Sequence, residues 1–325
     1  MFATGLRFDE LIPLFLAFGV TAALLPLLIP VLTRLKVGQT EREEGVQSHL
    51  KKAGTPTMGG LAILAGVAVV SIIFVWRFPR ILPVMILTIG FGLIGFLDDY
   101  LKVVLHRSDG LMPRQKLLGQ FGVTAVFLFV LLRVTRVPLD LAIPFAGDRM
   151  IRLGWLGIPF AFLVILATVN GVNFTDGLDG LASSVTVVVA IFFFCMARIS
   201  GAGADLSVMA LAVAGSLLGF LLFNAYPAKV FMGDTGSLAL GGFVAGCAYV
   251  LQMPLYIPII GFIYTAELLS VVIQVSYFKA THGKRIFKMT PIHHHFELCG
   301  WSETRIVTVF TAITVLLCMA ALVRA

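Results

Sequence analysis

Acidic side chains stand beside glycine and lysine in separate segments of this 325-residue chain. FLDDYLK carries the adjacent pair Asp98 and Asp99, with Lys102 one helical turn after Asp98, and FMGDTGS carries Asp234 shortly after Phe231. Carboxylates bind Mg²⁺ through hard oxygen atoms, and lysines neutralise phosphate charge. An aromatic ring at this position could stack on a base. These two segments therefore indicate phosphoryl chemistry.

A third acidic segment, NGVNFTDGLDG, occupies residues 170–180. It holds Asn170, Asn173, Asp176 and Asp179 among glycines, and polar groups three residues apart share one face of a helical turn. Glycine lets a ligand approach the backbone closely. An EF-hand is excluded because no Glu follows at the twelfth position of the loop. The segment predicts a ligand-binding turn.

Two further segments carry basic side chains. HLKKAGTPTMGG (49–60) places lysines before a turn that opens a helix, where free backbone N–H groups can bind an anion. PIHHHFE (291–297) contains three consecutive histidines. A zinc site there is disfavoured, because consecutive side chains point in different directions and no further Cys or His is spaced to complete a tetrahedron.

The stretches between these motifs are strongly apolar. The chain is 59% hydrophobic and 13% charged, against about 45–50% and about 25% in soluble domains. The apolar residues form about ten stretches of ~20 residues, long enough to cross a ~30 Å hydrocarbon core as helix. We therefore predict an all-α integral membrane protein, with one polytopic domain over residues 1–325. The predicted spans are 11–34, 57–76, 81–98, 117–135, 155–172, 181–198, 207–224, 236–253, 255–277 and 304–323.

The charged residues predict the orientation of these spans. Ten spans put both termini on one side and five loops (35–56, 99–116, 173–180, 225–235 and 278–303) on the other, where every lysine and histidine lies. Because positive charge accumulates in cytoplasmic loops, this loop side is predicted to be cytoplasmic and both termini extracytoplasmic. The net charge of +7 then reflects anchoring and an anionic substrate, and no nucleic-acid partner is expected. The outer loop 136–154 could form a small hairpin.

Each motif also has a structural interpretation. Asp98 and Asp99 could be a solvated pair at the membrane edge, although two carboxylates at a helix C-terminus oppose the helix dipole. Asp234 could be only a helix N-cap. Glu267, inside an apolar stretch, fits function and a hydrogen bond between helices equally. The four cysteines are too scattered for a disulfide framework, and the glycine stretch GGFVAG (241–246) would permit close helix contacts, including those of a homodimer.

GTPTMGG, LDDYLK, NFTDGLDG, FMGDTGS and PIHHHFE, in this order, resemble the motifs of the phospho-N-acetylmuramoyl-pentapeptide transferases. These are bacterial membrane enzymes with ten helices that make lipid I. The resemblance covers Gln47 to Glu297. The acidic motifs are shared with the wider group of polyprenyl-phosphate N-acetylhexosamine-1-phosphate transferases, in glycosyltransferase family 4. GTPTMGG and PIHHHFE point to the muramoyl-pentapeptide branch.

The resemblance implies an enzyme of the bacterial cytoplasmic membrane. It would join UDP-N-acetylmuramoyl-pentapeptide and undecaprenyl phosphate with the help of Mg²⁺. By motif, Asp234 looks like the Mg²⁺ ligand, Asp98 and Asp99 like a catalytic pair, and Lys116 like a phosphate-neutralising lysine. His293, His294 and His295 would face the diphosphate or the sugar. The nucleotide would be held by Lys52, Thr57, Asn173, Asp176, Gly177, Leu178, Asp179, Asn224, Phe231 and Gln274.

Alternatives stay open at this stage. A sister transferase that uses UDP-N-acetylglucosamine would share the acidic motifs. A transporter would also have many spans, but it would show inverted repeats and charges at mid-membrane, and the sequence shows neither. Within the favoured reaction, the lipid phosphate could attack the β-phosphorus directly, or an Asp carboxylate could first take the phospho-sugar.

Overall fold

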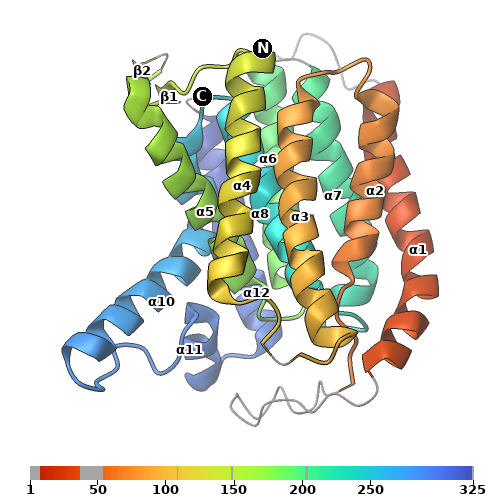
Figure 1. Ribbon diagram of the computed structural model, residues 1–325, viewed down its shortest axis with the longest axis vertical. Helices are drawn as coiled ribbons and strands as arrows, with labels where there is room; N and C mark the ends of the chain where they lie inside the picture. The colour runs from red at the N-terminus through yellow and green to blue at the C-terminus, as the bar shows by residue number, and fades with distance from the viewer. Residues whose placement is uncertain (1–7, 37–53, 108, 148, 202–203, 324–325) are drawn as a thin grey trace.

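The computed structural model describes residues 8–36, 54–107, 109–147, 149–201 and 204–323, and most of them are helical (Figure 1). The long helices are α1 (Ile12–Lys36), α2 (Gly60–Phe74), α3 (Ile81–Val103), α4 (Pro113–Phe129), α5 (Gly157–Thr175), α6 (Leu181–Ile199), α7 (Ala204–Asn224), α8 (Gly233–Val250), α10 (Phe262–Ala280) and α12 (Glu303–Leu322). The short elements are α9 (Ile257–Ile260), α11 (Ile292–Leu298), 3-10 turns at Phe8–Leu11, Gly154–Leu156 and Pro254–Tyr256, a π-helical turn at Val130–Val134, and strands β1 (Leu141–Ala142) and β2 (Met150–Ile151).

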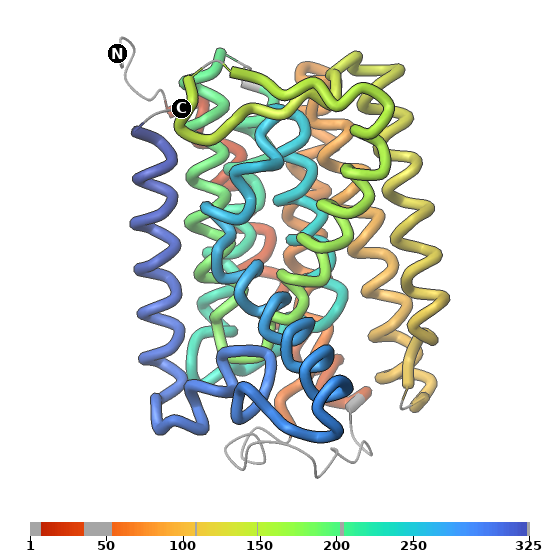
Figure 2. Tube along the Cα trace, turned by 90° about the vertical axis from the view of Figure 1, so that its left-hand side faces the viewer, coloured from red at the N-terminus to blue at the C-terminus, as the bar shows by residue number. Residues whose placement is uncertain are grey.

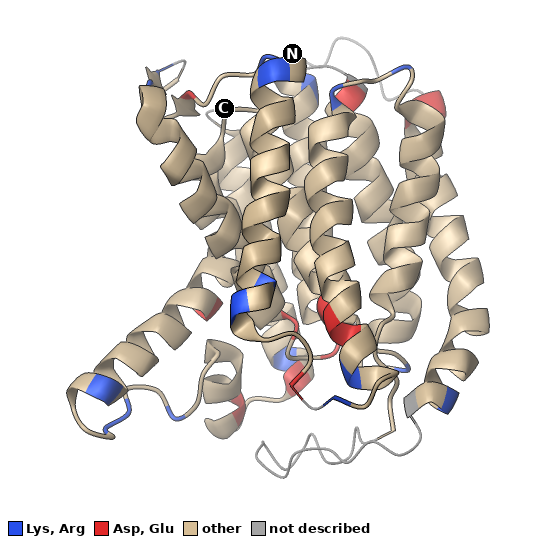
Figure 3. Cartoon of the chain, in the orientation of Figure 1, with Lys and Arg blue, Asp and Glu red and all other residues tan. Residues whose placement is uncertain are grey.

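The prediction of an all-α membrane protein is confirmed in its main feature. Within the described residues, seven helices are long and apolar enough to span a membrane, or eight if the bent pair of α9 and α10 is one span. Figure 3 shows the charged residues gathered toward the two ends of the bundle, with few of them between. The total of ten spans stays a prediction, because α2 has only 15 residues and α8 begins with a polar turn.

The segment predicted as a span over 255–277 is broken in the structure. Pro254–Ile260 and Phe262–Ala280 are bent by 87° at Gly261, so α10 leaves the bundle at a steep angle (Figure 1). Gly261 has a non-helical ψ of 35°, and glycine has a low helix propensity, which favours a break at this position. Because residues 255–277 are apolar on both sides of Gly261, their hydropathy did not indicate the break.

Three smaller features complete the comparison. Helix α3 continues to Val103, five residues beyond the predicted 98, so the acidic pair lies inside the helix. The histidine segment forms a short helix, α11, which the sequence did not predict. The predicted outer hairpin is confirmed, because β1 pairs antiparallel with β2 and Leu141 faces Ile151 across the ladder.

Helix α8 lies at the centre of the bundle and positions the helices around it. Thr235 to Tyr249 are all buried, and its glycines meet neighbouring backbones. A Cβ on Gly241 would lie 2.5 Å from Val169 Cα in α5, and one on Gly242 would lie 2.5 Å from Leu87 O in α3. GGFVAG therefore makes close helix contacts inside the chain. The possible homodimer gains no support from this segment.

The two ends of the helical bundle carry different segments of the chain. Helix α1 begins and α12 ends at the same end, whereas the acidic motifs gather at the opposite end, where α3 finishes and α8 begins (Figures 1 and 2). The alternation of helix directions thus brings segments far apart in sequence to one surface.

A valine at Gly242 should destabilise the protein. Its side chain would overlap the α3 backbone, and such overpacking costs about 1–3 kcal/mol. We expect a lower apparent melting temperature for Gly242→Val in detergent. Gly122→Val in α4 is the matched control, because a Cβ there meets nothing within 4 Å. Equal melting temperatures for the two variants would contradict this packing.

Candidate active site

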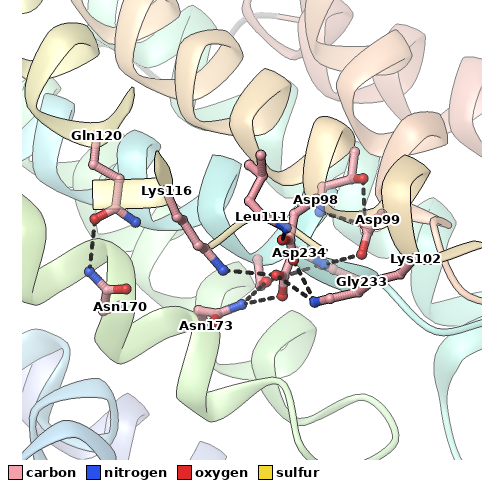
Figure 4. Close-up of polar contacts among 12 residues, drawn as sticks. Asp98, Asp99, Lys102, Leu111, Lys116, Gln120, Asn170, Asn173, Gly233 and Asp234 are labelled. Carbon is pink, nitrogen blue, oxygen red and sulfur yellow. Dashed lines mark hydrogen bonds and ion pairs between the residues drawn. The ribbon is translucent and has the colours of Figure 1, made fainter. Parts of the chain in front are cut away.

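The carboxylate of Asp99 caps the start of α8 from the neighbouring helix (Figure 4). Its Oδ1 accepts the backbone N–H of Asp234 at 3.2 Å, and its Oδ2 accepts the N–H and the hydroxyl of Thr235 at 2.9 and 2.6 Å. Oriented N–H groups and the positive end of the helix dipole favour a negative charge here. The Asp99 carboxylate opposes the dipole of its own helix, α3, and is stabilised by the dipole at the start of α8.

Glycine makes this approach possible. A Cβ on Gly95, one turn before Asp99, would lie 2.0 Å from the carbonyl oxygen of Asp234, so the backbones of α3 and α8 touch. Gly233, which starts α8, has a φ of +73°, which side chains rarely adopt. The spacing of glycine and aspartate in the two motifs therefore fixes how the two helices meet.

Asp234 is the centre of the polar contacts (Figure 4). Lys116 Nζ in α4 donates to its Oδ2 at 2.8 Å, Lys102 Nζ lies 3.5 Å from the same oxygen, and Asn173 Nδ2 in α5 donates to Oδ1 at 2.8 Å. Asp98 lies beside them and accepts Lys102 Nζ at 2.5 Å and the Leu111 N–H at 2.7 Å. Two lysines thus offset part of the carboxylate charge.

A cavity of about 450 Å³ opens beside this cluster. Ten of the predicted site residues line it: Thr57, Asp99, Asn173, Asp176, Gly177, Leu178, Asp179, Asn224, Phe231 and Asp234. Lys102, Val103 and Gly233 also line it, although they were not among the predicted site residues. Lys102 had a sequence signal, since it stands one turn after Asp98 in the same motif. The motif segments converge as their chemistry predicts.

Seven predicted site residues are not in the described cavity lining. Asp98 and Lys116 belong to the carboxylate and lysine cluster beside the cavity, and the others are His293, Gln274, His294, His295 and Lys52. Gln274 does not line the cavity: its Oε1 accepts the N–H groups of Ile286 and Phe287, both at 3.0 Å, and its Nε2 donates to Phe287 O. His294 and His295 are also outside the cavity lining, and they contact Glu297 and Lys288 instead. The position of Lys52 falls outside the described residues. Gln274 therefore stabilises the loop between α10 and α11.

Two of the lining residues shape the cavity through hydrogen bonds of their own. Asp179 Oδ2 accepts the N–H of Ala228 at 2.9 Å, and its own N–H donates to Glu303 Oε1 at 2.5 Å. Asn224 Nδ2 donates to Val230 O at 3.0 Å. Glu303 was not predicted from its sequence context, and its hydrogen bond with Asp179 joins the start of α12 to this wall of the cavity.

Asp176 stands at the end of α5 near the other carboxylates. Burial, together with the charges of Asp234 and Asp99, raises the pKa of Asp176 well above its usual value. A cation arriving at the cluster would relieve this repulsion. The carboxylate cluster can therefore accept a further positive charge beyond those of its lysines.

The donor set fits Mg²⁺ held jointly with phosphate. Among the described residues, no three His, Cys, Asp or Glu side chains group closely enough to hold a metal ion by themselves. Mg²⁺ commonly uses one or two carboxylates and completes its shell with water and substrate phosphate oxygens. Asp234, with carboxylates nearby and the cavity beside it, satisfies this requirement.

Carboxylates and lysines at one end of an apolar helical bundle define a membrane-bound transferase acting on phosphates. Residues 81–252 match the model of glycosyl transferase family 4. Residues 52–64 match phospho-N-acetylmuramoyl-pentapeptide-transferase signature 1. The chain belongs to the phospho-N-acetylmuramoyl-pentapeptide-transferase family.

Relatives of that name are similar over nearly the whole chain. The protein of Acetivibrio thermocellus is 53% identical over 94% of this chain and 92% of its own length. That of Caldicellulosiruptor bescii is 45% identical over 98% of both chains. That of Bacillus subtilis is 46% identical over 94% of this chain and 95% of its own length. The resemblance noted from the motifs is confirmed.

Removal of the Asp99 carboxylate should destabilise the substrate-free protein. Asp99→Ala leaves two backbone N–H groups and a hydroxyl at α8 without their acceptor, which costs about 1–3 kcal/mol. We expect a clearly lower apparent melting temperature. Asp140→Ala is the control, because its exposed partner Arg152 is 3.8 Å away and such pairs contribute little. An unchanged melting temperature of Asp99→Ala would contradict the capping role.

Proposed function

We propose that this protein transfers phospho-N-acetylmuramoyl-pentapeptide from UDP-N-acetylmuramoyl-pentapeptide to undecaprenyl phosphate, giving lipid I and UMP. This is the first membrane step of peptidoglycan synthesis, on which cell shape and division depend. The observation that carries the proposal is the cavity lined by Asp99, Lys102 and Asp234, beside which Lys116 contacts Asp234 and Asp98 contacts Lys102. The relatives are named for this transfer.

The position of each side chain supports a role in this reaction. Asp234 would hold Mg²⁺, which when bound neutralises and orients phosphate oxygens. Lys116 and Lys102 would offset the remaining phosphate charge. Asp99 would act by fixing Asp234 through α8, and Asp98 stays the candidate base. The uridine would lie between Phe231 and the Asn173–Asp179 turn, with Lys52, Thr57 and Asn224 around the nucleotide.

Four further residues would act from outside the cavity. Gln274, His294 and His295 would support the adjoining loop, and His293 would support the Asn173–Asp179 turn.

Direct attack by the acceptor is the favoured route. The second pKa of a phosphate monoester is ~6, so the lipid phosphate is mostly a dianion at neutral pH and needs little help from a base. Its oxygen would bond to the β-phosphorus while the bond from that phosphorus to the bridging oxygen breaks, and UMP leaves with the electron pair. The carboxylates of Asp98 and Asp99 are engaged by protein donors, which disfavours either as a nucleophile.

The lipid acceptor has a plausible approach along α10. After the bend at Gly261, this helix presents exposed apolar side chains, with Leu269 47% and Val272 51% exposed. Such an exposed apolar surface can contact a hydrocarbon chain in the membrane. We propose that undecaprenyl phosphate lies there, with its phosphate toward Lys116.

We also propose that the end carrying the cavity faces the bacterial cytoplasm. All lysines and histidines fall in the segments assigned to that side, which agrees with the accumulation of positive charge in cytoplasmic loops. Helices α1 to α8, the bent pair and α12 would make ten spans of the cytoplasmic membrane. Ten spans agree with α1 beginning and α12 ending at one end (Figure 2).

Purified protein with Mg²⁺, undecaprenyl phosphate and UDP-N-acetylmuramoyl-pentapeptide should release UMP. Asp234→Asn should lose at least about 100-fold in turnover, because the carboxylate that faces both lysines and the cavity is gone. Asp205→Asn, at the opposite end of the bundle, is the matched control and should keep its turnover. UMP release from UDP-N-acetylglucosamine instead would assign the sister reaction, and release from neither nucleotide would refute the proposal.

Direct attack predicts no partial reaction without the acceptor. Enzyme freed of lipid phosphate should not exchange labelled UMP into UDP-N-acetylmuramoyl-pentapeptide, and adding undecaprenyl phosphate should start turnover. Exchange in lipid-free enzyme would require a phospho-sugar intermediate on the protein and would contradict the direct route.

A further inference from the structure

Glu267 is a carboxylate enclosed in the second turn of α10, just after the bend at Gly261. Its side chain is fully buried, although the opposite face of the same helix carries exposed apolar residues such as Val272. A carboxylate in such surroundings is costly unless a partner compensates its charge. The sequence left function and structural hydrogen bonding equally open for this residue. Its partner in the structure decides between them.

That partner is the first histidine of the triplet. Glu267 Oε2 accepts the backbone N–H of His293 at 3.4 Å, and Oε1 lies 3.1 Å from His293 Nδ1, an ion-pair distance. The imidazole is also enclosed, with 1% of its side chain exposed. Glu267 therefore binds the backbone N–H of this residue and lies beside its ring, whose Nδ1 faces Oε1 at ion-pair distance without forming a hydrogen bond.

The other side of the imidazole is pressed against the nucleotide turn. A Cβ built on Gly177 would lie 2.2 Å from His293 Nε2, so the ring fills the space that a side chain at this position would need. Gly177 lines the cavity between Asp176 and Leu178. Among the described residues, His293 Nε2 is buried without a hydrogen-bond partner. His293 is not among the residues that line the cavity, so its ring supports the turn at Gly177 from the protein side.

The fold explains why Glu267 reaches this place. Gly171 in α5 lets the backbone of α10 approach closely, since a Cβ there would lie 2.8 Å from Tyr264 O. Tyr264, Glu267 and Gln274 are buried along one face of α10, and Gln274 fixes the loop before α11 through Ile286 and Phe287. The buried face of α10 therefore holds the loop before α11 and the segment with the three histidines in place.

We propose that Glu267 is a positioning residue for the nucleotide site, acting through His293 on the turn at Gly177. The carboxylate holds the backbone N–H of His293 and lies beside its ring, and the ring in turn fixes the Gly177 turn that lines the cavity where the UDP group would bind. This inference rests on the proposed function, because it takes the nucleotide of that reaction as the ligand.

The test is a double-mutant cycle on the full-length protein in lipid nanodiscs. Glu267→Gln and His293→Gln should each raise the KM for UDP-N-acetylmuramoyl-pentapeptide by about tenfold, with the KM for undecaprenyl phosphate within about twofold of wild type. The double variant should match His293→Gln within about twofold, because Glu267 acts only through that ring. Glu10→Gln is the matched control: it also breaks an ion pair, with Arg198 at 2.7 Å, and should change neither KM.

Three results would overturn the proposal: an unchanged KM for the nucleotide in Glu267→Gln, an equal loss for both substrates, or effects that multiply in the double variant. If Glu267→Gln does not fold, Glu267→Asp keeps the charge on a shorter side chain and should show the same selective rise in KM. A wild-type enzyme that releases no UMP would instead refute the proposed function and leave the cycle without a reaction to report on.

Discussion

The Asp99 carboxylate at the first turn of α8 is the interaction on which the site depends. It satisfies the N–H groups of Asp234 and Thr235, and the positive end of the α8 dipole offsets the negative end of α3. Because Gly95 lets the two backbones touch, this contact fixes both helices at the level of the cavity. Asp98 and Asp234 then both contact Lys102. The acidic motifs are therefore parts of one helix junction.

A second constraint comes from the break at Gly261. The 87° bend carries α10 away from the bundle, and its buried inner face turns toward the segment before α11. Gln274 binds that segment at Ile286, and Glu267 contacts His293 in the first turn of α11. One helix can thus expose an apolar face for a lipid and present a polar face to the nucleotide turn. This arrangement suits a reaction between a water-soluble donor and a membrane-borne acceptor.

Local spacing was enough to predict which acidic and glycine-containing segments line one cavity, because each motif keeps its acids and glycines within a few residues. Hydropathy located most helices, but it placed the end of α3 at the first charges, whereas the helix continues through Asp98 and Asp99 to Val103. The bend in an evenly apolar segment left no such signal. The contact of Asp179 with Glu303 also had no signal in the sequence. The two residues are 124 positions apart, and only the packed fold brings them together.

The most direct test of this account is a crystal structure of the protein with UMP and Mn²⁺, which substitutes for Mg²⁺ and can be located by its anomalous scattering. The account predicts one strong anomalous peak at the Asp234 carboxylate, with the UMP phosphate beside it and the uracil between Phe231 and the turn at Gly177. Nucleotide and metal bound together at another place in the bundle, with the cavity beside α8 empty, would contradict it.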